Sequence, residues 1–241
     1  MREYPCYIKI NESEGTVFST GMEFKAFIAA IPNKVDGFLL LKGFPTNSRL
    51  NRHTWWEYVS KEDMNEFMKE DVYDYGDFCW IDFHEEADLG KLSDQNIAEL
   101  LFAGHMKRPL GSPYFDVLKN HYLYLSHDDY YWVKIYMRDV RAYKRVIEQK
   151  VREMFIGRKK SLTPIPEEIL NELYHLFTNG AVFDFENRTV SSIHTGVRIY
   201  PTRDIGLCAE EIHAELDRLR NLSKVGRYLE YNPKTKKWGL L

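Results

Sequence analysis

Two neighbouring segments in the middle of the chain alternate strongly in side-chain character. Residues 121–127 and 130–137 are rich in aromatic and β-branched side chains, and a repeat of two residues is typical of β-strands. Two aspartates separate the segments. The pattern therefore predicts an antiparallel hairpin that turns at these aspartates and pairs Tyr124 with Val133.

Several shorter apolar segments in the first third of the chain also predict strands. Turn-forming residues such as Gly15 and Pro32 separate them, so we expect an antiparallel meander. The segments are 4–10, 16–19, 23–31 and 37–41. Farther along, the dense apolar run 78–81 predicts a strand that is buried on both faces, and residues 181–185 and 189–200 predict two more strands.

Five segments predict amphipathic helices because apolar side chains recur in them at helical spacing. They are 61–69, 93–106, 139–155, 166–178 and 207–222. Ser93 can cap the second of these helices, and Gly180 follows the fourth, where a left-handed glycine commonly ends a helix. The chain closes on two short strand-like segments around Asn232-Pro233-Lys234-Thr235, which predicts a C-terminal β-hairpin.

Together these elements predict an α+β fold, with a largely antiparallel sheet or sheets, flanking amphipathic helices and the C-terminal hairpin. A connector with two prolines follows Gly157. We therefore expect a main α+β domain over residues 1–157 and a smaller α+β block over 158–241. Because about 80 residues are near the lower limit for an independent core, the smaller block should pack on the first.

Composition excludes several classes of protein. Hydrophobic residues form 44% of the 241 residues and the formal net charge is −3, which is typical of a folded globular chain. The three cysteines form no C-x-x-C pair, the N-terminus has no apolar leader, and no apolar run reaches the roughly 18 residues of a membrane span. We therefore expect a cytoplasmic protein with free buried thiols and without a membrane partner, and we predict no cofactor and no bound metal.

Charge is unevenly distributed along the chain. Residues 62–94 contain twelve acidic residues and two lysines, whereas residues 134–160 contain ten basic and three acidic residues. A solvated face is the ordinary explanation, and a surface for a charged partner is the alternative. The basic helix 139–155 could therefore bind nucleic acid, although a chain close to neutral is atypical of general nucleic-acid binding.

The aromatic residues suggest an interaction surface. The chain contains 16 Tyr, 14 Phe and 5 Trp, most of which we expect in the core. In alternating structure one ring of the adjacent Trp55 and Trp56 must face solvent, where it could anchor a partner. Our leading hypothesis is a non-catalytic protein that binds another macromolecule, most simply a protein. The candidate contacts are these two tryptophans and the acidic residues Asp71, Asp74 and Asp77.

The alternative is an enzyme, and the sequence does not decide between the two. Histidine and carboxylate side chains can act as general acids and bases. The candidates for such roles are His105, His127, Asp128 and Asp129. Lys107 and Arg108 could then contact a phosphate group. This set predicts a hydrolase that acts on a phosphorylated or nucleic-acid substrate. His121 shares a strand face with His127, but roughly 20 Å of strand separates them, which is too far for one metal ion.

Two further carboxylate groups have weaker patterns. Asp82 and His84 share one face of a predicted strand and could meet a ligand, although an exposed strand end is the simpler explanation. Asp184 and Glu186 alternate as metal-binding acids do in some nucleases, but no D…E-x-K arrangement accompanies them. The sequence also lacks a P-loop, a G-x-G-x-x-G motif, a G-x-S-x-G motif and a kinase signature, which removes the most easily identified enzyme classes.

Overall fold

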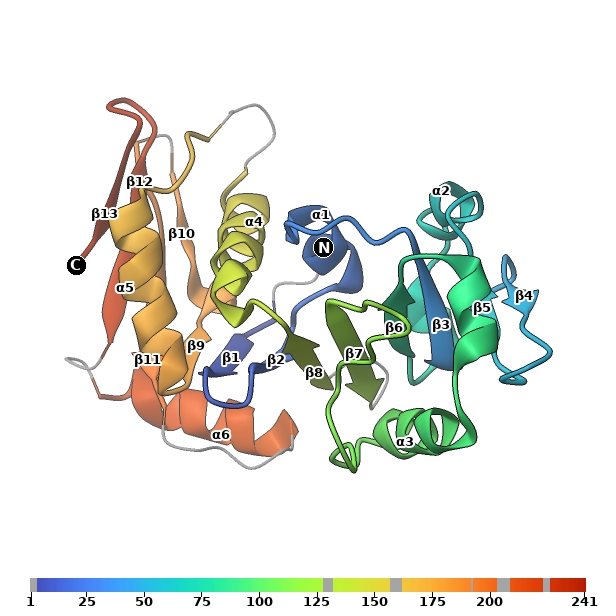
Figure 1. Ribbon diagram of the computed structural model, residues 1–241. Helices are drawn as coiled ribbons and strands as arrows, with labels where there is room; N and C mark the ends of the chain where they lie inside the picture. The colour runs from blue at the N-terminus through green and yellow to red at the C-terminus, as the bar shows by residue number, and fades with distance from the viewer. Residues whose placement is uncertain (1–3, 128–131, 157–161, 192, 203–208, 223–225) are drawn as a thin grey trace. The chain divides into compact units, whose positions relative to one another are not determined.

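The computed structural model describes residues 4–127, 132–156, 162–191, 193–202, 209–222 and 226–241 (Figure 1). It confirms the α+β class, because helices accompany antiparallel strand pairs. The chain divides into two compact units. Unit 1 is Met1–Glu12, Phe18–Ile31 and Arg141–Leu241, and unit 2 is Ser13–Val17 and Pro32–Val140. Unit 1 thus contains the C-terminal block together with two N-terminal segments. Whether residues 1–157 and 158–241 fold independently stays a prediction.

Unit 1 is built around antiparallel strands in the spatial order β13-β12-β11-β9-β1. The strands are β1 (Cys6–Asn11), β9 (Ala181–Phe183), β10 (Thr189–Val190), β11 (Thr195–Pro201), β12 (Arg227–Asn232) and β13 (Lys237–Leu240). The helices are α1 (Phe24–Ala30), α4 (Tyr143–Phe155), α5 (Glu167–Thr178) and α6 (Ala209–Arg220), with a 3-10 turn at Phe185–Asn187. β12 and β13 form the predicted C-terminal hairpin.

Unit 2 contains antiparallel strands in the spatial order β8-β7-β6-β3-β5-β4. The strands are β3 (Gly37–Lys42), β4 (Arg49–Leu50), β5 (Glu57–Val59), β6 (Cys79–Phe83), β7 (Tyr122–His127) and β8 (Trp132–Met137). The helices are α2 (Met64–Phe67) and α3 (Asp94–Gly104), with 3-10 helices at Val72–Tyr75 and Glu86–Lys91. Strand β2 (Thr16–Thr20) begins in unit 2 and ends in unit 1.

Strand β6 is buried on both faces, as its apolar run predicted. On one face Trp80 stacks on Tyr124 with the ring centroids 5.3 Å apart, and Phe38 packs beside Trp80. On the other face Ile81 belongs to a second buried cluster, with Leu100 of α3 and leucines of β3 and β7. The aromatic residues around β6 are therefore used mainly to fill the core of unit 2.

β7 and β8 form the predicted hairpin, but in a different register. Tyr124 pairs with Ile135, two residues beyond its predicted partner, and the last pair is His127 with Trp132. Four residues, 128–131, thus separate the paired ends in place of the two-residue turn, and these four lie outside the described residues. Because the shift is two residues, each side chain keeps its predicted face.

The segment 23–31 forms helix α1, and the prediction of a strand in an N-terminal meander was wrong there. Its buried residues include Phe24 and Phe27, whose three-residue spacing suits a helix. Three alanines in the same segment also favour helix. The run 23–31 is nearly continuously apolar, and such a run does not by itself distinguish a buried strand from a buried helix.

The segment 189–200 is also not one strand. Residues 189–190 form β10, which folds back on β11 and pairs Val190 with Thr195. β11 then pairs on one side with β9 and on the other with β12. After β10, the Ser191 N–H donates to the His194 carbonyl at 2.8 Å.

The remaining predicted helices are confirmed, and two of them are clearly shorter than predicted. α2 is only four residues long, and α4 begins at Tyr143, after a 3-10 turn at Val140–Ala142. α3 begins as predicted, at a capping box. The Ser93 side chain accepts a hydrogen bond from the Asn96 N–H, and the Asn96 side chain accepts one from the Ser93 N–H. Gly180 follows α5 with a φ of +84°, the left-handed conformation expected there.

Candidate functional site

The Trp55 loop (51–56) connects β4 to β5 in unit 2. The side-chain oxygen of Asn51 accepts hydrogen bonds from the N–H groups of His53 and Thr54 at 3.1 and 2.9 Å. The same oxygen accepts from the Thr54 hydroxyl, and the Trp55 N–H donates to the Asn51 carbonyl at 2.9 Å. Because its successive backbone N–H groups are bonded to one residue, the loop holds a defined conformation.

This conformation turns Trp55 outward. Its φ of +59° lies in the left-handed region, which is rare for a bulky residue, and Trp55 is 76% exposed. Trp56, by contrast, packs against the buried cluster that contains Ile81. Leu50, which precedes the loop, is also exposed. One of the two tryptophans therefore faces solvent, as expected, but a left-handed loop residue turns it outward and not the alternation of a strand. Its role in binding stays a prediction.

The structure places the three acidic candidates only in part. Asp71 is exposed directly before a 3-10 helix. The side chain of Asp74 lies outside the described part of the structure. Asp77 takes part in an ion-pair group, with its carboxylate 3.3 Å from Lys42 Nζ and 3.1 Å from His127 Nδ1. Asp77 is thus directed to neighbours within unit 2.

His127 lies at the end of β7, beside Asp77. Burial lowers the pKa of His127, and although Asp77 opposes this effect, the charges of Lys42 and His105 add to it. The net direction is downward, which favours the neutral ring. His105 follows α3 and is exposed. Asp77 contacts both Lys42 and His127. The sequence had placed Asp77 with the tryptophans on the predicted interaction surface.

The other candidates of the hydrolase hypothesis are placed only in part. Lys107 and Arg108 are exposed in the segment after α3, two and three residues beyond His105. The Lys107 N–H donates to the Phe102 carbonyl at 3.3 Å, which keeps the segment close to the end of α3. Asp128 and Asp129 lie outside the described residues. The two aspartates therefore cannot be assigned to the His127 group.

The basic face of α4 is largely committed to partners within unit 1. Two of its cations, and Arg141 of the 3-10 turn that precedes it, form ion pairs with carboxylates. The pairs are Arg141–Glu12, Lys144–Glu167 and Arg152–Glu148. Lys150 was expected on the same face, but it is only 3% exposed, and its charge partly offsets the rise in pKa that burial gives the Cys6 thiol. Nucleic-acid binding by this helix stays a prediction, with fewer free cations than the sequence suggested.

Asp184 and Glu186 are held by an arginine. Arg220 of α6 donates to both carboxylate oxygens of Asp184 at 2.9 and 2.6 Å and to Glu186 at 2.7 Å. Burial raises the pKa of Asp184, but the hydrogen bonds from Arg220 and Asn187 outweigh burial and leave it lowered. A structural role explains this carboxylate pair.

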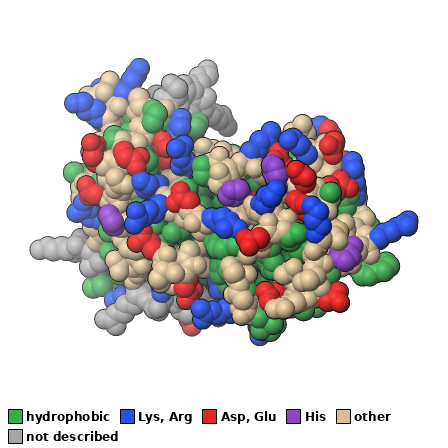
Figure 2. Space-filling model, viewed as in Figure 1, with side chains coloured by type: hydrophobic (Ala, Val, Ile, Leu, Met, Phe, Trp, Pro, Cys, Tyr) green, Lys and Arg blue, Asp and Glu red, His purple; other side chains and the backbone are tan. Residues whose placement is uncertain are grey.

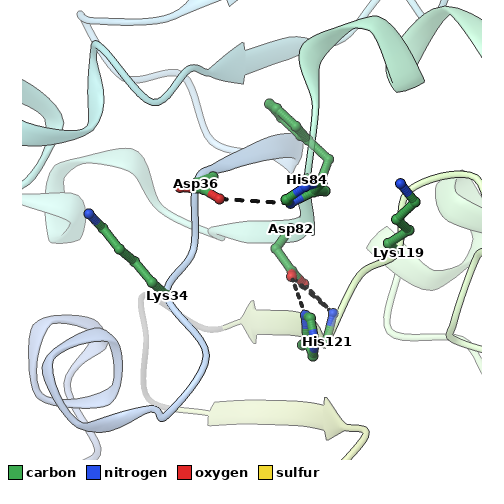
Figure 3. A pocket seen from close by; sticks show the side chains of 7 residues that line it. Lys34, Asp36, Asp82, His84, Lys119 and His121 are labelled. Carbon is green, nitrogen blue, oxygen red and sulfur yellow. Dashed lines mark hydrogen bonds and ion pairs between the residues drawn. The ribbon is translucent and has the colours of Figure 1, made fainter.

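A pocket in unit 2 collects side chains that are distant in the sequence (Figure 3). It has a volume of about 200 Å³ and is bounded by the start of β3, the end of β6 and the start of β7. The lining residues are Lys34, Asp36, Asp82, Phe83, His84, Lys119 and His121. In Figure 3 the two lysines stand at opposite sides, with the imidazoles and carboxylates between them. Figure 2 shows basic, acidic and histidine side chains interspersed over the visible face of the molecule.

The carboxylates of the pocket already have partners. Asp82 is 5% exposed and accepts from the backbone N–H groups of His121 at 2.9 Å and Tyr122 at 2.6 Å, so it ties the start of β7 to β6. Asp36 lies 2.9 Å from Lys61 Nζ and 3.8 Å from His84 Nδ1. The sequence had indicated Asp82 and His84 as a possible ligand contact, whereas no pattern in the sequence indicated Lys34 or Lys119.

The described residues contain no group of three His, Cys, Asp or Glu side chains that could hold a metal ion. No helix in the same part of the chain is long and apolar enough to cross a membrane. Cys6 and Cys79 are free and buried, as expected, and Cys208 lies outside the described residues. Comparisons with protein-family models, with curated proteins and with solved structures found no match.

Proposed function

We propose that this protein is a non-catalytic binding protein that holds a partner protein through Trp55. The observation that carries the proposal is the combination of exposure and backbone strain at this residue. A left-handed conformation costs an ordinary L-residue roughly 1–2 kcal/mol, and strained residues that a surrounding structure holds in place cluster at functional sites. Here the bonds to Asn51 hold Trp55 in that conformation with its ring in solvent.

A presented tryptophan suits recognition of a protein. Tryptophan is enriched among the few interface residues whose removal costs at least about 2 kcal/mol of binding free energy. Its ring has only two side-chain torsions to fix, so little conformational entropy is lost on binding. Leu50 beside the loop is 57% exposed and extends the apolar contact. The partner should therefore offer an apolar recess for the ring.

The charge around the loop favours a particular rim on the partner. Arg52 lies within the loop and is exposed. Arg49 precedes the loop but lies 2.8 Å from Asp63, so much of its charge is used within unit 2. A recess bordered by a carboxylate would pair with Arg52, and such rim charges mainly set the association rate and specificity.

Site-specific photocrosslinking tests the proposal. A photoreactive phenylalanine analogue is placed at position 55, and at position 110 as a control, because Leu110 is similarly exposed at 71% in the same unit. Position 55 should crosslink one defined protein in extracts of the source cells, and position 110 should not. Crosslinks that are absent at position 55, or equal at both positions, would refute the assignment of this surface.

A hydrolase is the second candidate, and the group around His127 favours it. Asp77 lies 3.1 Å from His127 Nδ1, and the pKa of His127 is lowered, chiefly by burial and in part by the charges of Lys42 and His105. A neutral imidazole oriented by a carboxylate can act as a general base. The substrate would be a phosphorylated compound or a nucleic acid, with Lys107 and Arg108 as phosphate contacts.

Activity measurements test this second candidate. Para-nitrophenyl phosphate and a single-stranded oligonucleotide serve as substrates for the full chain, with and without Mg²⁺. His127→Gln should lower kcat/KM at least about 100-fold, the usual minimum for loss of a general base. His213→Gln, an exposed histidine of α6, is the control. Activity that survives in His127→Gln would exclude this role.

A further inference from the structure

The pocket in unit 2 presents two lysines that its carboxylates do not pair with, together with two imidazoles that each face a carboxylate. Lys34 and Lys119 are both exposed at its margins, and within the described part of the chain neither forms an ion pair. The side chains of His84 and His121 are 56% and 43% exposed and lie between the two lysines (Figure 3). Four side chains that donate hydrogen bonds therefore surround one hollow.

The carboxylates nearby have partners other than the two lysines. Asp36 is paired with Lys61 and lies 3.8 Å from His84 Nδ1. Asp82 accepts two backbone N–H groups and lies 3.6 Å from His121 Nδ1. A third carboxylate, Asp88, is buried beside the pocket, where its hydrogen bond to Lys91 at 2.6 Å, and at longer range the charges of Lys119 and His84, lower its pKa. Asp36 and Asp82 are thus held by neighbours other than Lys34 and Lys119, whereas Oδ2 of Asp88 is buried without a hydrogen-bond partner among the described residues.

The charges around the pocket are balanced. The lining contains two lysines and two aspartates. Beside it Lys61 pairs with Asp36, and Lys91 pairs with Asp88 and also feels the charge of Glu85. Because the two lining aspartates have other partners, Lys34 and Lys119 can pair with an added anion. The described His, Cys, Asp and Glu side chains form no group that could hold a metal ion.

We propose that this pocket binds a small ligand through a phosphate group, held by Lys34, Lys119, His84 and His121. Charge-assisted hydrogen bonds from ammonium and imidazole donors are the interactions that phosphate oxygens form in proteins. The volume of about 200 Å³ is below that of a drug-sized site, which suits free phosphate or a small phosphate monoester. Phe83 supplies the one apolar wall.

This site is separate from both surfaces discussed above. Lys34, Lys119 and the two imidazoles do not belong to the Trp55 loop, so loss of the proposed partner contact leaves the inference standing. The pocket is at the start of β7, whereas His127 is at its end, roughly 20 Å away along the strand. A phosphate bound here would not reach the His127 group.

Isothermal titration calorimetry on the full chain tests the inference. The probes are inorganic phosphate and phenyl phosphate, each at ionic strength matched with sodium chloride. The variants are the double changes Lys34→Gln with Lys119→Gln, and His84→Gln with His121→Gln. Lys25→Gln with Lys69→Gln removes two exposed lysines elsewhere and is the matched control. Circular dichroism confirms that each variant is folded.

We expect a Kd below about 1 mM for at least one probe, with at least tenfold weaker binding in either test variant and unchanged binding in the control. Tighter binding of phenyl phosphate would identify a phosphorylated small molecule as the ligand, and tighter binding of inorganic phosphate would identify the free ion. The inference is overturned if neither probe binds, or if the lysine variant binds as the unchanged protein does. It is equally overturned if binding is lost instead in Lys107→Gln with Arg108→Gln.

Discussion

Replacing Arg220 by alanine should destabilise unit 1 substantially. The change leaves Asp184, which is 1% exposed, without the two hydrogen bonds that Arg220 donates at 2.9 and 2.6 Å. Removal of one partner from a buried ion pair costs about 3–5 kcal/mol. The Arg220 side chain is 25% exposed and Asn187 still donates to the carboxylate, so we expect the lower end, about 3 kcal/mol.

The loss of stability in Arg220→Ala should depend on pH. The pKa of Asp184 is lowered in the folded protein, so the stabilisation is fully present above the unfolded pKa of about 3.9 and is lost as pH falls through the folded pKa. The difference in unfolding free energy between the unchanged protein and Arg220→Ala should therefore shrink in acid, because a protonated Asp184 no longer needs a cation.

Urea unfolding followed by circular dichroism at pH 7 and at pH 3.5 measures both effects. Arg218→Ala is the matched control, because Arg218 pairs with Glu215 on the same helix but its side chain is 53% exposed. That control should change stability little, since exposed ion pairs contribute weakly. A loss below about 1 kcal/mol in Arg220→Ala at pH 7, or a loss that does not shrink in acid, would refute the reasoning.

Three further predictions follow from single residues. Trp55→Gly should be more stable than Trp55→Ala by about 1 kcal/mol, because glycine adopts a φ of +59° without strain, and urea unfolding of both variants measures the difference. Asp77→Asn should lower the pKa of His127 still further in an NMR titration, because the carboxylate is the group that raises it; an upward shift would contradict the observed pairing. Burial raises the pKa of the Cys6 thiol to about 11 and of the Cys79 thiol to about 12. In a Cys208→Ala variant, a disulfide reagent at pH 8 should therefore label neither thiol before the chain unfolds. Rapid labelling would show that one of the two thiols is accessible.

The fold class and most element positions could be predicted from local patterns. The hairpin of β7 and β8 shows what such patterns cannot predict. Alternation fixed which face each side chain occupies, but the register depends on the number of loop residues, and two adjacent aspartates suggested a shorter turn than the strands adopt. In α1, a nearly continuous apolar run suited a strand as well as a helix, and packing within unit 1 decided between them.

The candidate sites were predictable only where a short segment contained the signal. Trp55 and Trp56 are adjacent, so alternation alone predicted that one ring faces solvent. The pocket could not be found in this way, because its residues come from the segments before β3, at the end of β6 and before β7, which only the strand pairing brings together. The lysines of the pocket carry no local pattern that distinguishes them from other surface lysines.

The central claim is that Trp55 anchors a partner protein, and the affinity of the purified partner for Trp55→Gly tests it most directly. This variant removes the ring and leaves the loop in an unstrained conformation, so folding and binding are separated. We expect binding at least about 30-fold weaker than for the unchanged protein, which corresponds to a contact of about 2 kcal/mol. Leu110→Ala should bind normally. Equal affinity of Trp55→Gly and the unchanged protein would contradict the account.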